Sequence, residues 1–261
     1  MASGPVVQGN LMQAAILIKE AAKKGADMVV LPESFAIMGQ NEEQRVAIAE
    51  EDGQGVIQNT LGELAANFGI WIVSGTIPLK TDDPKKSTAS SIMIDDKGKQ
   101  VARYDKIHLF DVVLEDNNEV YNESATTVAG SEPVVVDTPF GKIGMTVCYD
   151  LRFPKLYRKL IEQGAEILLI PSAFTELTGK AHWEPLLRAR AIENLSYVIA
   201  PAQGGYHVNG KTTHGNSMMI DFWGKICDRS SKGANVIMMD IDLQAQRQVR
   251  KNFPVLEHRK L

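Results

Sequence analysis

The sequence predicts an α/β fold of layered type, in which mixed β-sheets are covered by helices. Segments with apolar residues at helical spacing alternate with short apolar runs along the whole chain. Some predicted strands are joined by tight turns into hairpins, whereas others are separated by a helix and form βαβ units. Neither a low-complexity linker nor a short repeat divides the 261 residues, so we expect a single domain over residues 1–261.

The amino-terminal part supplies two helices and the first strands. Apolar positions recur at helical spacing in residues 10–24, and the glycine that follows ends this helix. The short apolar run 28–31 predicts a buried strand. A second helix is expected over residues 55–68, again followed by glycine, and the β-rich stretch 70–77 comes next.

Hairpins account for three pairs of strands farther along the chain, because each pair flanks a short turn that contains glycine. These pairs are 90–94 with 100–104, 134–136 with 142–147, and 217–221 with 225–227. The other segments alternate between helix and strand: helices over 154–163 and 181–194, strands over 166–170, 197–200 and 236–241, and a last helix from Leu243.

Charge and composition exclude several classes of function. The net charge is −4, and Lys and Arg are interleaved with Asp and Glu, so we expect no nucleic-acid partner. No apolar run approaches the roughly 20 residues that span a bilayer, and the first residues lack the features of a secretory signal. Two cysteines do not make a disulfide framework. We therefore expect a cytoplasmic protein that acts on a small molecule and has no membrane partner.

Cys148 is the first candidate for chemistry, because it stands where an apolar strand ends and a turn begins. An α/β enzyme presents a nucleophile in this way. Polar residues follow it, among them Tyr149 and Arg152, and then a helix whose amino end favours a thiolate. The alternative is a buried structural cysteine, which is our interpretation of Cys227 in a predicted hairpin strand.

A carboxylate and an amine also follow predicted strands. Glu33 is either a general base for the thiol or a rim carboxylate bonded to nearby backbone. Lys106 is either a solvated surface lysine or a cation that stabilises an oxyanion. Catalytic groups of such folds gather at the carboxyl ends of strands, so both are expected beside the thiol. His108 and His182 belong to no cluster with metal-ligand spacing, and we expect no metal and no organic cofactor.

With a carboxylate, an amine and a thiol in this order, the chain resembles the nitrilase superfamily of carbon–nitrogen hydrolases over nearly its whole length. A lone cysteine would not identify this family, but several matching runs in the same order do. The matching runs are Leu-Pro-Glu at 31–33, Asp-Lys-Ile-His-Leu-Phe-Asp at 105–111, Val-Cys-Tyr-Asp-Leu-Arg-Phe-Pro at 147–154, Pro-Ser-Ala-Phe at 171–174, Thr-Gly-Lys-Ala-His-Trp-Glu at 178–184 and Arg-Ala-Arg-Ala-Ile-Glu-Asn at 188–194.

The resemblance implies an αββα sandwich whose members usually form homodimers, so that sheets and helices stack into a longer, four-layered sandwich. It places the catalytic triad of the family on Glu33, Lys106 and Cys148. A second glutamate common in the family corresponds to Glu123, which follows a loop of variable length over residues 112–120. No cofactor is implied.

The chemistry that the resemblance implies is hydrolysis through a thioester. Glu33 accepts the thiol proton as Cys148 attacks the amide carbon, and Lys106 with the Tyr149 N–H holds the oxyanion. Ammonia or an amine leaves, and water activated by a glutamate then hydrolyses the thioester.

Within the superfamily, three runs resemble the deaminated-glutathione amidase branch, with the ω-amidases acting on α-ketoglutaramate as close neighbours. They are Ser-Ala-Phe-Thr at 172–175, the run at 178–184, and Ala-Gln-Gly-Gly-Tyr-His at 202–207. Both branches take an anionic α-keto acid head. Arg152 would bind a carboxylate, or else form a salt bridge to a nearby acidic residue. Thr175 and Thr178 would line the pocket, or else only make loop hydrogen bonds.

Other functions remain open at this point. A nitrile or N-carbamoyl substrate would use the same triad and differ only in the pocket loops. A non-catalytic scaffold or binding subunit would keep the fold, although this chain retains all three triad positions. A thiol redox protein would need a resolving cysteine, for which Cys227 is the sole candidate, and no Cys-x-x-Cys occurs.

The amino terminus departs from the family pattern. Family chains normally open with an apolar strand that leads into the segment found here at residues 1–3, and this strand is missing. Its loss would expose a neighbouring strand edge and remove apolar burial, at a cost of several kcal/mol. We therefore expect the natural protein to begin upstream, and the intact mass of the protein purified from its own cells would test this expectation.

Overall fold

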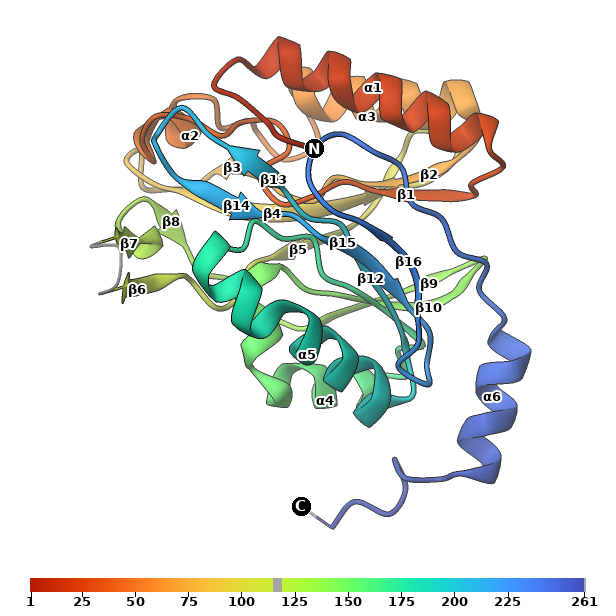
Figure 1. Cartoon of the computed structure of the whole chain (residues 1–261). Coiled ribbons are helices and arrows are strands. Elements are labelled where there is room, and N and C mark those ends of the chain that lie inside the picture. Colours follow the sequence, from red (N-terminus) through yellow and green to blue (C-terminus); the bar gives the residue numbers. More distant parts are fainter. Residues whose placement is uncertain (115–118, 261) are drawn as a thin grey trace.

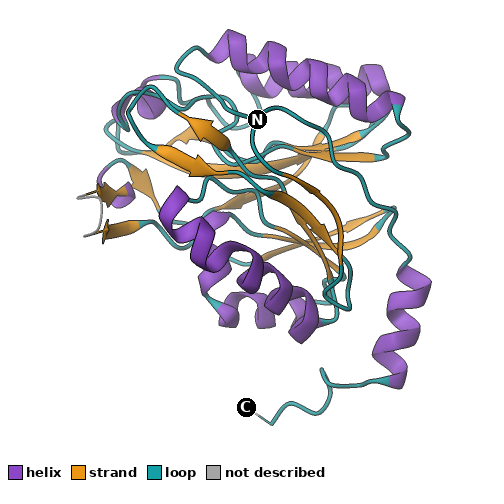
Figure 2. Ribbon diagram, in the orientation of Figure 1, coloured by secondary structure: helices purple, strands orange, loops and turns teal. Residues whose placement is uncertain are grey.

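A computed structural model describes residues 1–114 and 119–260, and its two six-stranded sheets lie face to face with helices on their outer sides (Figures 1 and 2). Helices α1 (Val7–Lys23) and α3 (Val56–Phe68) cover the first sheet. Helices α4 (Pro154–Glu162) and α5 (Glu176–Asn194) cover the second. The predicted αββα layering is confirmed.

The first sheet has the order β1–β2–β4–β3, and β5 and β8 also pair with β4. Strands β1 and β2 are parallel, and the β4–β5 pair is the predicted hairpin. The strands are β1 (Met28–Val30), β2 (Trp71–Val73), β3 (Ile77–Lys80), β4 (Ser87–Ile94), β5 (Gln100–Asp105) and β8 (Thr127–Val128).

The second sheet has the order β16–β15–β12–β11–β10–β9. Its three central strands are parallel, as βαβ connections require, and hairpins supply both edges. The strands are β9 (Val134–Thr138), β10 (Gly141–Met145), β11 (Ile167–Leu169), β12 (Tyr197–Ala200), β15 (Ser217–Ile220) and β16 (Ile226–Ser230).

Several shorter elements complete the described chain. Two small hairpins are formed by β6 (Asp111–Leu114) with β7 (Glu119–Asn122) and by β13 (Gly204–Tyr206) with β14 (Thr212–His214). The remaining helices are α2 (Glu43–Ala47), the 3₁₀ helices η2 (Glu123–Ala125) and η3 (Cys148–Arg152), and α6 (Leu243–Asn252).

Two of the predicted boundaries that differ from the structure lie close to the pocket described below. The expected loop over 112–120 is largely the β6–β7 hairpin, and its residues 115–118 lie outside the described part of the chain. Helix α5 begins five residues before the predicted start at 181, at Glu176, because Thr175 caps it: the Thr175 Oγ1 accepts the Thr178 N–H at 3.3 Å.

The predicted strand over residues 236–241 is wrong. This segment lies beside a cavity of about 840 Å³, which is also lined by β1 and by apolar residues of β12 and β15. Strand β1 is at the edge of its sheet and pairs only with β2. A strand requires a partner for its backbone groups, and within the described chain no strand lies between β1 and residues 236–241. No strand precedes α1 either, as the departure from the family pattern predicts.

Across residues 1–114 and 119–260, no helix combines the length and the apolar character that crossing a bilayer requires.

Candidate active site

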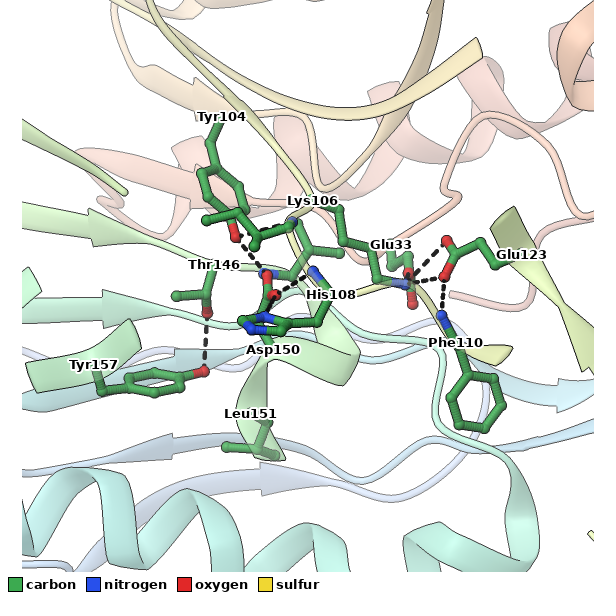
Figure 3. Close-up of polar contacts among 12 residues, drawn as sticks. Glu33, Tyr104, Lys106, His108, Phe110, Glu123, Thr146, Asp150, Leu151 and Tyr157 are labelled. Atoms are coloured by element: carbon green, nitrogen blue, oxygen red, sulfur yellow. Dashed lines mark hydrogen bonds and ion pairs between the residues drawn. The ribbon is translucent and has the colours of Figure 1, made fainter. Parts of the chain in front are cut away.

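The residues predicted to carry chemistry meet where strands of both sheets end. Glu33 follows β1, Lys106 directly follows β5, and Cys148 opens η3 just beyond β10. Glu123 opens η2 after the β6–β7 hairpin. All four line one pocket, and the acidic side chains of Glu33 and Glu123 point at the Lys106 ammonium (Figure 3).

Lys106 is held between two carboxylates. Its Nζ lies 2.9 Å from Glu33 Oε1 and 2.8 Å from Glu123 Oε2. Glu123 is fixed in turn by the Phe110 N–H, which donates to its Oε2 at 2.7 Å. Only 2% of Lys106 is exposed, and burial alone would lower its pKa, but the charges of Glu123 and Glu33 raise the pKa well above its usual value. The lysine is therefore a permanent cation in this site.

The Cys148 thiol is buried in the same pocket and stays protonated at rest. Burial raises its pKa well above the usual value, and the Glu33 charge raises it further, whereas Lys106 opposes the shift. We expected the amino end of a helix to favour the thiolate, but burial and the charge of Glu33 outweigh that effect. A base must remove the proton before the sulfur can attack, and Glu33 is positioned near it.

The turn that presents Cys148 is strained. Its backbone φ is 49°, in the left-handed region that residues other than glycine rarely adopt. The Cys148 N–H donates to the Pro171 carbonyl at 3.0 Å, which ties this turn to the end of β11. The next N–H, that of Tyr149, finds no acceptor among the described groups and remains available to a ligand.

A buried carboxylate that we did not predict connects the two halves of the site. Asp150 accepts the Tyr104 hydroxyl at 2.6 Å and the Val147 N–H at 2.9 Å. Its other oxygen accepts the His108 N–H at 3.1 Å and lies 2.6 Å from His108 Nδ1. Tyr104 and His108 flank Lys106, so Asp150 fixes the strand end that carries the lysine to the turn that carries Cys148 (Figure 3).

The predicted substrate-binding residues also line the pocket, a cavity of about 100 Å³. The Arg152 guanidinium lies 5.2 Å from the Phe174 ring centroid and 3.2 Å from His182 Nδ1. It forms no salt bridge with a described carboxylate, which argues against the structural alternative for this residue. Thr175 and Thr178 line the pocket, as predicted. They also hydrogen-bond to each other, with their Oγ1 atoms 2.8 Å apart, so the alternative role in loop hydrogen bonding holds as well.

Sequence reasoning missed two further cations of this pocket, Arg45 and Lys211. Arg45 pairs with Glu42 at 2.9 Å, and the Lys211 Nζ lies 3.7 Å from the Tyr121 ring centroid. Both lie far along the chain from Cys148, on segments whose sequence gives no signal that they contribute to this pocket.

The second cysteine does not take part. Cys227 lies in β16, as predicted, but it is exposed, so its assignment to the core is wrong. Side chains alternate along this edge strand, and Cys227 lies on its outer face. Residues 1–114 and 119–260 contain no group of three His, Cys, Asp or Glu side chains that would hold a metal ion.

Known proteins are similar to this chain over nearly its whole length. The family model "Carbon-nitrogen hydrolase" matches residues 5–251. The deaminated glutathione amidase of Yersinia enterocolitica is 41% identical over 259 residues, which are 99% of this chain and 90% of that protein. The human deaminated glutathione amidase is 39% identical, with 99% of this chain and 80% of that protein covered.

Two solved structures have the same architecture. The Caenorhabditis elegans NitFhit protein superimposes with a TM-score of 0.91 at 37% identity. That match covers 100% of this chain but only 63% of NitFhit, so the chain spans less than two thirds of that protein. Nit3 of Saccharomyces cerevisiae, a member of the nitrilase superfamily, superimposes with a TM-score of 0.86 at 31% identity, with 97% of this chain and 91% of Nit3 covered.

Proposed function

The chain belongs to the carbon–nitrogen hydrolase family, and from this we propose that it hydrolyses the amide bond of deaminated glutathione or a similar α-keto acid amide through a cysteine thioester. The observation that carries the proposal is a permanent cation, Lys106, held between Glu33 and Glu123 in the pocket that contains the Cys148 thiol. This arrangement supplies a nucleophile, a base and an oxyanion-stabilising charge in one place.

The first step forms the bond between sulfur and carbon. Glu33 takes the thiol proton as the Cys148 sulfur attacks the amide carbon, because the raised pKa of the thiol leaves little thiolate without a base. The carbonyl oxygen becomes an oxyanion, which the Lys106 ammonium and the Tyr149 N–H stabilise. Both donors are fixed before the substrate arrives, so little reorganisation is needed.

The second step breaks the bond between carbon and nitrogen. Glu33 returns the proton to the amide nitrogen, the amine departs, and a thioester remains on Cys148. Water then attacks the thioester carbonyl and gives its proton to a glutamate, which returns it to the sulfur as the carboxylic acid leaves. Glu123 holds Lys106 in place throughout, and the Phe110 N–H fixes Glu123.

Arg152 supports an anionic substrate. Its guanidinium lines the pocket without a described carboxylate partner and suits the carboxylate of an α-keto acid. This feature suits α-ketoglutaramate equally well, so ω-amidase activity is the second candidate. A nitrile without a carboxylate would gain nothing from Arg152.

We further propose that the protein acts as a cytoplasmic homodimer, which size-exclusion chromatography with light scattering and cell fractionation would test.

Intact-protein mass spectrometry during turnover tests the proposal. Deaminated glutathione and α-ketoglutaramate are supplied side by side, and we expect a transient acyl adduct on Cys148 with release of the corresponding acid. Cys148→Ala should abolish both adduct and turnover without loss of folding. Cys227→Ser is the matched control, because it removes the other thiol, and it should behave as wild type.

Two outcomes would contradict the proposal. Wild-type activity in Cys148→Ala would exclude the thioester mechanism. A folded wild-type protein that turns over neither substrate would instead favour a different amide, or a scaffold that retains the family fold.

A further inference from the structure

The pocket around Cys148 holds two cationic side chains without a carboxylate partner among the described residues, Arg152 and Lys211. A further cation that lines the pocket, Arg45, is already paired with Glu42. A cation in a partly desolvated pocket is costly unless an anion approaches it. The proposed function uses Arg152 for the acyl half of the substrate and gives Lys211 no role.

Lys211 is held in place on the turn between β13 and β14. Its N–H donates to the Asn209 side chain at 3.0 Å, and its carbonyl accepts the His207 N–H at 2.9 Å. The ammonium lies 3.7 Å from the Tyr121 ring centroid, which is a cation–π contact. Burial lowers the pKa of Lys211, and the nearby charges of Glu42 and Glu119 offset this only in part. The Tyr121 contact holds the ammonium at the pocket, where no described carboxylate forms a salt bridge with it.

The pocket offers one cation without a carboxylate partner for each half of an amide bound at Cys148. The amine half must lie near Glu33, because that carboxylate returns the proton to the leaving nitrogen. The proposed function places the carboxylate of the acyl half at Arg152, which leaves Lys211 as the pocket cation that forms no salt bridge with a described carboxylate. A carboxylate on the amine half is therefore directed to Lys211.

Resting on the proposed function, we infer that Lys211 binds a carboxylate on the amine half of the substrate. It thereby selects amides whose amine is itself an amino acid or a short peptide. A primary amide, which releases ammonia, presents no such group and gains nothing from Lys211. Lys211 would thus be the residue that separates cleavage of peptide-like amides from ω-amidase activity on one shared triad.

A pair of substrates isolates this contact. Deaminated glutathione carries a glycine carboxylate on its amine half, and its analogue with a carboxamide at that position differs only in the charge. We expect wild-type kcat/KM to be about tenfold higher for the carboxylate, mostly through KM, as for one charge-assisted contact in a partly solvated site. Lys211→Met should lower kcat/KM for the carboxylate by about tenfold and leave the carboxamide unchanged.

Two variants serve as controls. Lys211→Arg keeps the charge and should retain the preference for the carboxylate. Lys97→Met makes the same chemical change at an exposed lysine outside the pocket and should match wild type on both substrates. The inference is overturned if Lys211→Met still prefers the carboxylate, or if it weakens turnover of both substrates equally.

A binding measurement separates this inference from the proposed function. Dissociation constants of both compounds are measured for Cys148→Ser and for the double variant that also carries Lys211→Met. If wild type cleaves neither compound, the proposed function fails, but a preference of about tenfold that disappears with Lys211→Met still supports the Lys211 contact. Equal dissociation constants in the two variants would overturn it.

Discussion

Single residues at this site act through charges that are fixed before a substrate binds. Lys106 is almost completely buried, which would ordinarily favour its neutral form, but Glu33 and Glu123 keep it charged. The residues that contribute these groups stand at strand ends with recognisable motifs, and the sequence alone predicts that they meet. The structural role of Asp150 was not predicted. Nothing in a single sequence shows that one carboxylate accepts hydrogen bonds from residues 104, 108 and 147 at once.

Asp150→Asn is expected to impair kcat more than KM. Asp150 is fully buried, and an amide in its place turns an NH₂ group toward donors such as the Tyr104 hydroxyl or the Val147 N–H. We expect urea unfolding to show a loss of about 3 kcal/mol. Steady-state kinetics should show a reduced kcat, because the Lys106 and Cys148 segments lose their shared anchor.

Asp240→Asn provides the matched control for this prediction, because Asp240 is exposed and lies outside the site. It should leave both the unfolding free energy and kcat unchanged. A role for Asp150 in positioning would be contradicted by an Asp150→Asn protein that is as stable and as active as wild type.

At the scale of elements, the run Ala-Gln-Gly-Gly-Tyr-His attaches the amino-terminal segment to the site. The Gln203 side-chain amide donates to Ser3 Oγ at 2.8 Å and to the Glu33 carbonyl at 3.2 Å. His207 Nδ1 lies 3.1 Å from the Ser3 carbonyl, and its Nε2 lies 2.8 Å from Thr213 Oγ1 on β14. The run at 202–207, which we used above only for its resemblance to one branch of the family, therefore also has a structural role. It holds the segment before α1 beside Glu33.

This anchor predicts a loss of stability in acid. Burial lowers the pKa of His207 in the folded protein below its usual value of about 6.5. The unfolded chain therefore binds a proton that the folded chain does not, so the unfolding free energy falls as the pH drops below about 6.5. Urea unfolding at pH 7.5 and pH 5.5 should show a loss about 1 kcal/mol larger in wild type than in His207→Gln.

His258→Gln is the control for this pH dependence, because His258 is exposed. It should lose as much stability in acid as wild type does. If His207→Gln also loses as much as wild type, the acid sensitivity originates elsewhere.

Elements were predictable where their signals are local. Helix α3 ends at Gly69, which adopts a φ of 62°, and the β4–β5 hairpin turns where aspartates and a glycine indicate. Residues 236–241 have the same apolar character as the true strands, but a strand also needs a partner edge. That requirement depends on the whole fold, which explains why local reasoning failed there.

At the scale of the whole molecule, a cavity of about 840 Å³ interrupts the close packing of the described layers. One side is β1, the edge strand of the first sheet, and the other is the extended segment 236–241. Apolar side chains such as Val30 and Ile199 line it, and Met1 reaches it from the amino end. Its position between two extended backbones suits one additional strand, entered directly from Met1.

An extension at Met1 should therefore stabilise the protein when it can form that strand. Six residues that alternate valine and threonine would pair with β1 and bury apolar surface in the cavity, and we expect a rise in Tm of at least about 4 °C by calorimetry. Hydrogen exchange should slow at Met28 and Val30, which lie on the open edge of β1, and across residues 236–241. An extension of six glycines and serines cannot fill the cavity with side chains, so it measures the effect of added length alone. Equal Tm values for the two extensions would show that the gap between β1 and 236–241 does not accept a strand, and that the fold closes it in some other way.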